Sequence, residues 1–345
     1  MARKTRATRQ QNYYGDFEPV QRIELSGKHL KLRAAVAVLF AVVGIFFLAK
    51  WAIGLFRSDP GVRRIEVLSK SDAAAYAAEF ALSYNIGQAG LSATAENKQL
   101  TALYTQLLEE AKEKYSLEAL NAAPGKAVEV SKEMYAALGK LADAGEPAER
   151  IIFLAPAYEM YSSVFFSQSD EEAAKADPYK NADAAKALAE LAEYFSDPSH
   201  VRIELEGGSK ARLVVSDAYM AYAKQHGMEA FADLAWLENA LIVDYVSDGL
   251  IAQGFRLGSF ASYDGYSRNF GETEGYAQAF IKTGPTVEYD RAHYYVYADG
   301  TVRHCWLQTA TGRCAQIPAD FGEKRAGAEN SCFEVIIGLA KSLLK

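Results

Sequence analysis

Cysteine is scarce in this chain of 345 residues: the three that occur are Cys305, Cys314 and Cys332, all close to the C-terminus. A disulfide between Cys305 and Cys314 is compatible with a location outside the cytoplasm, but the sequence leaves its formation open. The spacing of the three matches no zinc-binding pattern. The sequence also lacks a P-loop, a GxSxG elbow, an HExxH helix and a CxxC motif, so the generic signatures of these enzyme classes are excluded.

Excess basic charge is confined to one end of the chain. Residues 1–33 carry eight Lys and Arg against three Asp and Glu, a net charge of +5, whereas the whole chain has a net charge of −7. The remainder therefore carries −12. An acidic domain of this kind gives no indication of a nucleic-acid partner, and we expect none.

One long hydrophobic run is present. Residues 34–49 include no polar side chain, and after Lys50 the run continues to Phe56. As a helix it is about 35 Å long at about 1.5 Å per residue, enough to cross a hydrocarbon core of about 30 Å. Lys50 lies near the far end, where its stem reaches the headgroups, and Trp51 suits the same interface. We predict a transmembrane helix at residues 34–56.

The charge distribution predicts the topology of this anchor. A basic N-terminal flank stays in the cytoplasm. A cleaved signal peptide is the alternative, but its basic region would be unusually long and no A-x-A site follows the apolar run. We therefore predict a single-pass cell-membrane protein: a basic cytoplasmic tail at 1–33, the signal-anchor helix in contact with membrane lipid, a linker at 57–70 and an extracytoplasmic domain at 71–345.

The outer domain mixes the patterns of helices and strands. Apolar residues between Leu100 and Tyr115 recur at spacings of three and four, which predicts one buried face of a helix. Ser131 and Ser216 are expected to cap two further helices, and a longer helix is expected from Glu229 to about Ala252. Two β-branched runs between residues 201 and 215, separated by EGGSK, predict a hairpin.

A second hairpin is predicted in HYYVYADGTVRHCWL, where Asp299-Gly300 suits a type I′ turn. A last helix is expected from Cys332 to Leu344. Hairpins and helices occur in blocks rather than in regular βαβ alternation, so we predict an α+β fold. The residues expected in its core are Leu107, Leu120, Leu241, Ile242 and Val296.

Several segments follow one another in the order of a known family. SLEALN at residues 116–121 resembles the pattern S-x-L-x-x-LN, and DLAWLENALIVD at 233–244 matches DLGGIAKGYAVD in length, with both ends kept. The hairpin at 295–304, followed by Thr311-Gly312, resembles a hairpin and the segment H-I-I-D-P-x-T-G. Over roughly residues 75–340 the chain thus resembles the ApbE-type flavin transferases.

Enzymes of that family are extracytoplasmic, are often membrane- or lipid-anchored, and move FMN from FAD onto a Thr of a target protein with magnesium. The resemblance implies an ApbE-like flavin transferase fold behind the anchor, FAD and magnesium as cofactors if the activity is retained, and an extracytoplasmic flavoprotein or membrane complex as partner. It makes His304 the candidate catalytic base for the acceptor hydroxyl. The cofactor-binding positions that it implies are Glu238, Asn239, Asp244, Asp264, Gly265, Thr311 and Gly312.

The sequence departs from the family where the chemistry should be. Residues 235–236 are Ala-Trp in place of Gly-Gly, and Trp236 would fill space that a dinucleotide needs. Glu238 would bring a negative charge near an anionic pyrophosphate. The family's magnesium-binding Asp and Thr fall near residues 331–332 and 335–336, which offer few oxygen ligands. No metal ligand is therefore predicted.

These departures favour a degenerate domain, a pseudoenzyme that no longer transfers FMN and acts in binding or assembly. Two alternatives stay open: an active FAD:protein FMN transferase with a remodelled site, and an anchoring or scaffold protein without any ligand. For His304 the alternative to catalysis is a polar residue that supports the hairpin. A Gly-rich pocket beside an oxygen-rich metal cluster would favour the enzyme, and a filled pocket would favour the other two.

Overall fold

The computed structural model describes residues 61–67, 80–87, 92–234, 237–262, 265–270, 294–316 and 331–343. The chain divides into two compact units, Met1–Arg57 and Ser58–Lys345. All described residues belong to the second unit, so the predicted tail and membrane helix lie outside them. In the ranges given above, no helix is long and apolar enough to cross a membrane.

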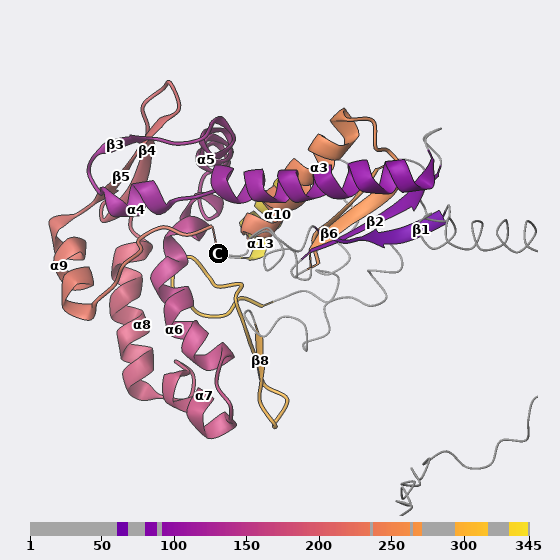
Figure 1. Cartoon of the computed structure of the whole chain (residues 1–345). Helices are drawn as coiled ribbons and strands as arrows, with labels where there is room; N and C mark the ends of the chain where they lie inside the picture. Colours follow the sequence, from indigo (N-terminus) through magenta and orange to yellow (C-terminus); the bar gives the residue numbers. More distant parts are fainter. Residues whose placement is uncertain are drawn as a thin grey trace, which may run out of the picture. The chain divides into compact units, whose positions relative to one another are not determined.

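Helices and strands occur in blocks, as an α+β fold requires (Figure 1). The described strands are β1 (Gly61–Ile65), β2 (Phe80–Ile86), β3 (Ala127–Glu129), β4 (Val201–Leu205), β5 (Lys210–Val215), β6 (Gly258–Ser262), β7 (Ser267–Phe270), β8 (Tyr294–Val296) and β9 (Val302–His304). The described helices are α3 (Ala93–Lys114), α4 (Glu118–Ala122), α5 (Lys132–Ala144), η2 (Ala148–Leu154), α6 (Ala155–Phe165), α7 (Asp170–Ala176), α8 (Ala182–Phe195), α9 (Asp217–His226), α10 (Leu237–Ala252) and α13 (Cys332–Leu343).

A four-stranded antiparallel sheet in the order β1-β2-β6-β7 packs against α3 and α10. Tyr104 of α3 lies edge-on to Phe260 of β6, with 5.5 Å between the ring centroids. Phe260 also stacks on Phe80 of β2 at 5.5 Å. Because β6 is buried along its whole length, this sheet and its two helices form the apolar centre of the unit.

The predicted buried face of the first long helix is confirmed. Its buried apolar residues are Leu100, Tyr104, Leu107, Leu108 and Ala111. Opposite Leu107, α10 carries Gly249, where an added Cβ would lie 2.5 Å from Leu107 Cδ2. The two helices approach this closely because Gly249 has no side chain.

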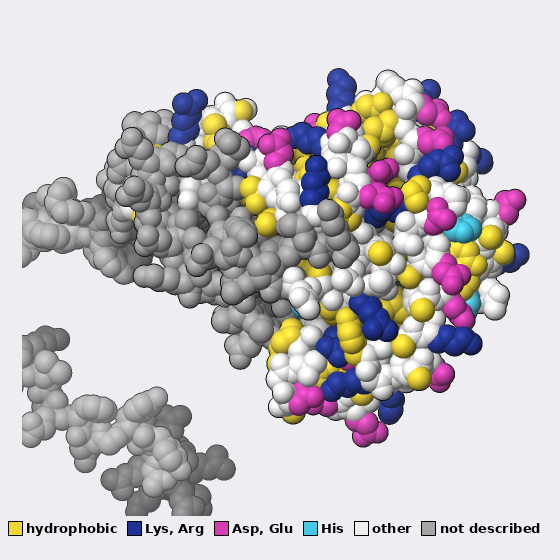
Figure 2. Space-filling model, turned by 180° about the vertical axis from the view of Figure 1, so that it is seen from behind, with side chains coloured by type: hydrophobic (Ala, Val, Ile, Leu, Met, Phe, Trp, Pro, Cys, Tyr) yellow, Lys and Arg dark blue, Asp and Glu magenta, His cyan; other side chains and the backbone are white. Residues whose placement is uncertain are grey.

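A second region contains the sheet β3-β5-β4 and the helices α4 to α9. The predicted hairpin of β4 and β5 is confirmed, and its turn uses left-handed backbone at Gly207, Gly208 and Ser209. Both predicted helix caps are also confirmed: Ser131 Oγ accepts from Met134 N at 2.8 Å, and Ser216 Oγ accepts from Tyr219 N at 3.2 Å. Positive and negative side chains intermix over the described surface (Figure 2).

The expected start of the long helix at Glu229 is wrong. The backbone before α10 bonds to a side chain instead: Asn121 Oδ1 accepts from Phe231 N at 2.9 Å and from Ala232 N at 3.1 Å, and Asn121 Nδ2 donates to Ala232 O at 2.7 Å. Because these backbone groups have a distant partner, they do not enter a helical ladder. The helix begins at Leu237.

Two expectations for the β8–β9 hairpin are also wrong. Val296 is 40% exposed, because side chains alternate along the strand and its neighbour Tyr297 is the one that faces inward. Gly300 has φ 81°, but Asp299 is not among the described residues with positive φ, and a type I′ turn needs positive φ at both positions. The other four predicted core residues are buried.

Candidate functional site

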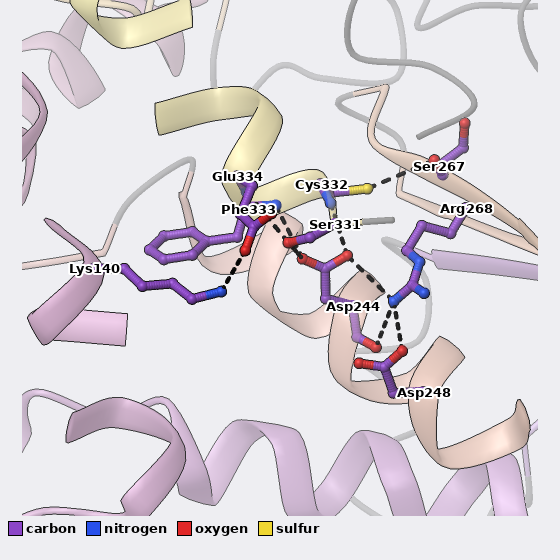
Figure 3. A network of polar contacts seen from close by, with 9 residues as sticks. All are labelled: Lys140, Asp244, Asp248, Ser267, Arg268, Ser331, Cys332, Phe333 and Glu334. Atoms are coloured by element: carbon purple, nitrogen blue, oxygen red, sulfur yellow. Dashed lines mark hydrogen bonds and ion pairs between the residues drawn. The ribbon is translucent and has the colours of Figure 1, made fainter. Parts of the chain in front are cut away.

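Asp244, a predicted cofactor residue, lies in the middle of α10 and points at the N-terminus of α13 (Figure 3). Its Oδ2 accepts from Ser331 Oγ at 2.6 Å and from Phe333 N at 2.9 Å, and its Oδ1 accepts from Cys332 N at 2.8 Å. The first N–H groups of a helix have no acceptor within the helix. Asp244 supplies that acceptor from another part of the chain, so it caps α13.

Arg268 of β7 completes the surroundings of this carboxylate (Figure 3). Its Nη1 donates to Asp248 Oδ1 at 2.8 Å and to the Asp244 carbonyl at 3.3 Å, and it lies 3.6 Å from Asp244 Oδ1. Burial raises the pKa of Asp244 above its ordinary value, while the bonds from Ser331 and the α13 backbone and the charge of Arg268 lower it. Hydrogen-bond donors therefore already surround the carboxylate.

The first turn of α13 does not fit magnesium. The Cys332 side chain is buried and its thiol donates to Ser267 O at 3.6 Å, while Glu334 points away to pair with Lys140 at 2.7 Å. A divalent cation here would meet backbone N–H groups and the Arg268 guanidinium, whereas magnesium needs oxygen ligands in near-octahedral geometry. Across the described ranges, no group of three or more His, Cys, Asp or Glu is placed to hold a metal.

His304, the predicted catalytic base, lies on β9 and is only 9% exposed. Burial lowers its pKa to about 4, so the ring is neutral at pH 7 and accepts a proton weakly. The Trp306 ring lies 5.6 Å from the imidazole, and Cys314 Sγ donates to the His304 carbonyl at 3.5 Å. His304 is therefore packed into the hairpin.

The opposite face of the β8–β9 hairpin is held by two carboxylates of the α7 region. Asp177, which is fully buried, accepts from Arg303 Nε at 2.9 and 3.0 Å and from Tyr297 OH at 2.8 Å, and Asp170 accepts from Tyr295 OH at 2.9 Å. Burial and Asp177 raise the pKa of Tyr297, and Asp177 raises the pKa of Arg303 against the effect of burial. We refer to these five residues as the hairpin clamp.

Three of the remaining predicted cofactor residues lie in α10 and at the turn between β6 and β7. Glu238 and Asn239 lie in the first turn of α10, where Asn239 is 8% exposed. Asp264 lies outside the described residues, as does Trp236. Gly265 has φ 99° and its N–H donates to the Ser262 carbonyl at 3.1 Å, so this glycine makes the turn between two strands.

Thr311 and Gly312 lie in a loop against α8. Thr311 Oγ1 donates to Gln308 Oε1 at 2.9 Å, and Thr311 lines an open hollow of about 340 Å³ beside α8. Gly312 has φ 65°, and an added Cβ would lie 2.7 Å from Leu188 Cδ1. Close packing against α8 and a left-handed backbone therefore explain the glycine.

The predicted residues thus serve different parts of the structure: Asp244 of α10 caps α13, Gly312 packs against α8, and His304 lies in the hairpin. Arg268 and the hairpin clamp were not predicted from the sequence. A signal for Arg268 was present, because Asp244 and Asp248 are two carboxylates four residues apart in a largely apolar helix. No local signal announces Asp177, whose partner Arg303 lies 126 residues further along the chain.

All three cysteines are free. Leu307 pairs directly with Cys314 in an antiparallel bridge, so Cys305 lies diagonally opposite Cys314. Diagonal neighbours in such a pair are about 7–8 Å apart, beyond the usual Cα separation of a disulfide. This register does not accommodate a Cys305–Cys314 disulfide, and burial raises the pKa of the Cys314 thiol.

No protein-family model and no curated protein matches the chain. Among solved structures, the chain is similar to the flavin transferase ApbE from Vibrio cholerae, solved as a histidine-to-glycine mutant. The two sequences are 17% identical, the match covers 56% of this chain and 59% of that chain, and the TM-score is 0.34. The chain is also similar to the ApbE protein from Thermotoga maritima, with 12% identity, coverage of 75% and 79%, and a TM-score of 0.45.

The match to the Vibrio cholerae protein spans less than two thirds of that protein's chain. Both structures are of ApbE proteins, the family that the sequence resembles.

Proposed function

We propose that the chain is a membrane-anchored, extracytoplasmic, flavin-transferase-like protein that does not transfer FMN and acts by binding or assembling with a protein partner. The order of the sequence segments and the name of the Vibrio cholerae structure, flavin transferase ApbE, support the likeness to a flavin transferase. The apolar run at residues 34–56 and the basic residues before it support the anchor and its orientation. The capping of α13 by Asp244 is the observation on which the loss of transfer chiefly rests.

A carboxylate that serves a metal must offer its oxygens to the cation. Asp244 instead accepts three hydrogen bonds at 2.6–2.9 Å from the start of α13. Taking one oxygen away from these donors would leave buried N–H groups unpaired, at a cost of about 1–3 kcal/mol each. Metal binding at this place therefore competes with the fold.

The second requirement of the transfer is a base beside the acceptor hydroxyl. His304 is 9% exposed and its pKa is lowered to about 4 by burial. A general base is most effective with a pKa near the working pH, so this imidazole is poorly matched to the task. The partner class that remains is an extracytoplasmic flavoprotein or a membrane complex, which this chain would contact without modifying it.

The test is an in-gel flavin fluorescence assay. The full chain in detergent is incubated with FAD, magnesium and a Thr-containing acceptor domain, and the acceptor band is imaged after denaturing electrophoresis. We expect no fluorescent acceptor. A fluorescent band that is lost in the His304→Ala variant would establish an active transferase and overturn the proposal.

The anchor and its orientation are tested separately. We expect Gln10→Cys to be shielded from a membrane-impermeant maleimide in intact cells and Ser199→Cys, at an exposed position after α8, to be labelled. The unchanged chain serves as the control for its own cysteines. Labelling of both positions from outside would show that the N-terminus is not cytoplasmic.

A further inference from the structure

An open hollow of about 270 Å³ lies between α6, α8 and α9, helices that carry neither Asp244 nor His304. Histidine side chains lie beside hydrophobic and acidic ones at the edge of the surface in Figure 2. The residues that line the hollow are Pro156, Glu159, Met160, Ala187, Leu191, Tyr222, His226 and Met228. Two thioethers and one imidazole therefore share a single concave surface.

The end of α9 brings two of these groups together. Gly227 follows His226 with a left-handed φ of 67°, and Met228 N donates back to the Ala223 carbonyl at 2.9 Å. This helix end turns the chain, so that His226 and Met228 line the same hollow.

The His226 ring is exposed, and its contact with Tyr222 fixes its orientation. It stacks on Tyr222 with 4.3 Å between the ring centroids. In the part of the chain that the structure describes, the imidazole has no hydrogen-bond or ion-pair partner. Stacking on Tyr222 uses the face of the ring and leaves the nitrogens at its edge for a ligand.

Met160 of α6 provides the second thioether. Met160 and Met228 are both half-buried on the walls of the hollow, whereas Met134 is fully buried in the core. A methionine side chain has three rotatable bonds, so both sulfur atoms can turn toward a ligand of ionic size. Glu159 adds a carboxylate to the same surface.

These ligands select one class of metal. Thioether sulfur is a soft ligand that suits Cu(I), imidazole also binds copper, and neither suits a hard cation such as magnesium. We propose that Met160, His226 and Met228 form a binding site for Cu(I). The negative charge of Glu159 favours the monovalent cation electrostatically. The site is independent of the flavin-transferase-like function proposed above.

The first test is a Cu(I) titration of the full chain against a chromophoric chelator, in a Cys314→Ala background because a thiol also binds Cu(I). We expect Met160→Leu, Met228→Leu and His226→Phe each to weaken binding by at least about tenfold. The matched control is Met220→Leu, because Met220 lies on α9 and is 40% exposed but does not line the hollow. Affinities that are equal in all four variants would overturn the proposal.

A second measurement uses the unsubstituted chain, so it does not depend on whether the variants fold. The methionine methyl groups of the unsubstituted chain are followed by NMR while Ag(I), a redox-inert substitute for Cu(I), is added. We expect the Met160 and Met228 signals to shift together and the Met220 and Met134 signals to stay in place. If the Met220 signal shifts as much as the Met160 signal, or if no signal shifts, the proposed binding site is wrong.

Discussion

The α3–α10 interface and the β8–β9 hairpin are held by opposite kinds of contact. In the first, the apolar side chain of Leu107 packs onto the bare backbone of Gly249. In the second, a fully buried carboxylate, Asp177, binds Arg303 and Tyr297. The apolar contact depends on close packing and loses stability when volume is added or removed. The polar contact loses stability when one partner is removed, since an unpaired buried charge is costly.

Two of the predicted site residues belong to contacts of the polar kind. Asp244 resembles the hairpin clamp, because it is a half-buried carboxylate that fixes an element from another part of the chain. His304 belongs to the hairpin that the clamp holds. Polar residues at these places support the fold, and under the proposed function that use competes with the binding of a metal or substrate.

The largest effect is expected from the hairpin clamp. Arg303→Ala leaves Asp177 buried without its cation, so we expect the free energy of unfolding to fall by about 3–5 kcal/mol in urea denaturation. Arg313→Ala, at an exposed position, is the control and should change it by less than about 0.5 kcal/mol. The double variant Asp177→Asn, Arg303→Met should lose less than Arg303→Ala alone. A loss below about 1 kcal/mol in Arg303→Ala would remove the distinction between the two regions.

The apolar interface is tested by a double-mutant cycle. Leu107→Ala should cost about 2–5 kcal/mol as a core truncation. Gly249→Ala should cost about 1–3 kcal/mol, because its new Cβ overlaps Leu107. In the Leu107→Ala background the same change should be neutral or stabilising, since the space is then open and Ala favours a helix. Additive losses in chemical denaturation would mean that the close approach is not what matters there.

The sequence predicts local patterns better than it predicts polar contacts between distant residues. The face of α3 and the caps at Ser131 and Ser216 follow from spacing and from local capping chemistry, and they were predicted. The start of α10 was missed because Asn121 binds backbone that lies 110 residues further along. The clamp was missed for the same reason. Contacts between distant polar residues leave no periodic trace in a single sequence.

A smaller effect is expected from pH at His304 in the hairpin. His304 has a pKa lowered by burial from 6.5 to about 4, so between these values the unfolded chain binds a proton that the folded chain does not. Its contribution to stability is therefore present above pH 6.5 and is lost as the pH falls toward 4, by at most about 3 kcal/mol.

The measurement is the free energy of unfolding at several pH values between 6.5 and 4. His304→Gln should lose less stability than the unchanged chain over this range. Leu107→Ala should follow the pH profile of the unchanged chain, displaced to lower stability throughout. The same profile in His304→Gln as in the unchanged chain would show that the buried histidine is not what responds.

The central claim is that Asp244 caps α13 and does not bind a cofactor. Its most direct test is the melting temperature of the full chain and of Asp244→Ala, each measured with and without FAD and magnesium. A ligand that binds only the folded state raises the melting temperature. We predict that Asp244→Ala melts at a lower temperature than the unchanged chain, because α13 loses its cap, and that FAD with magnesium shifts neither protein. A melting temperature that rises with FAD and magnesium in the unchanged chain, and does not rise in Asp244→Ala, would contradict this account and place the cofactor at Asp244.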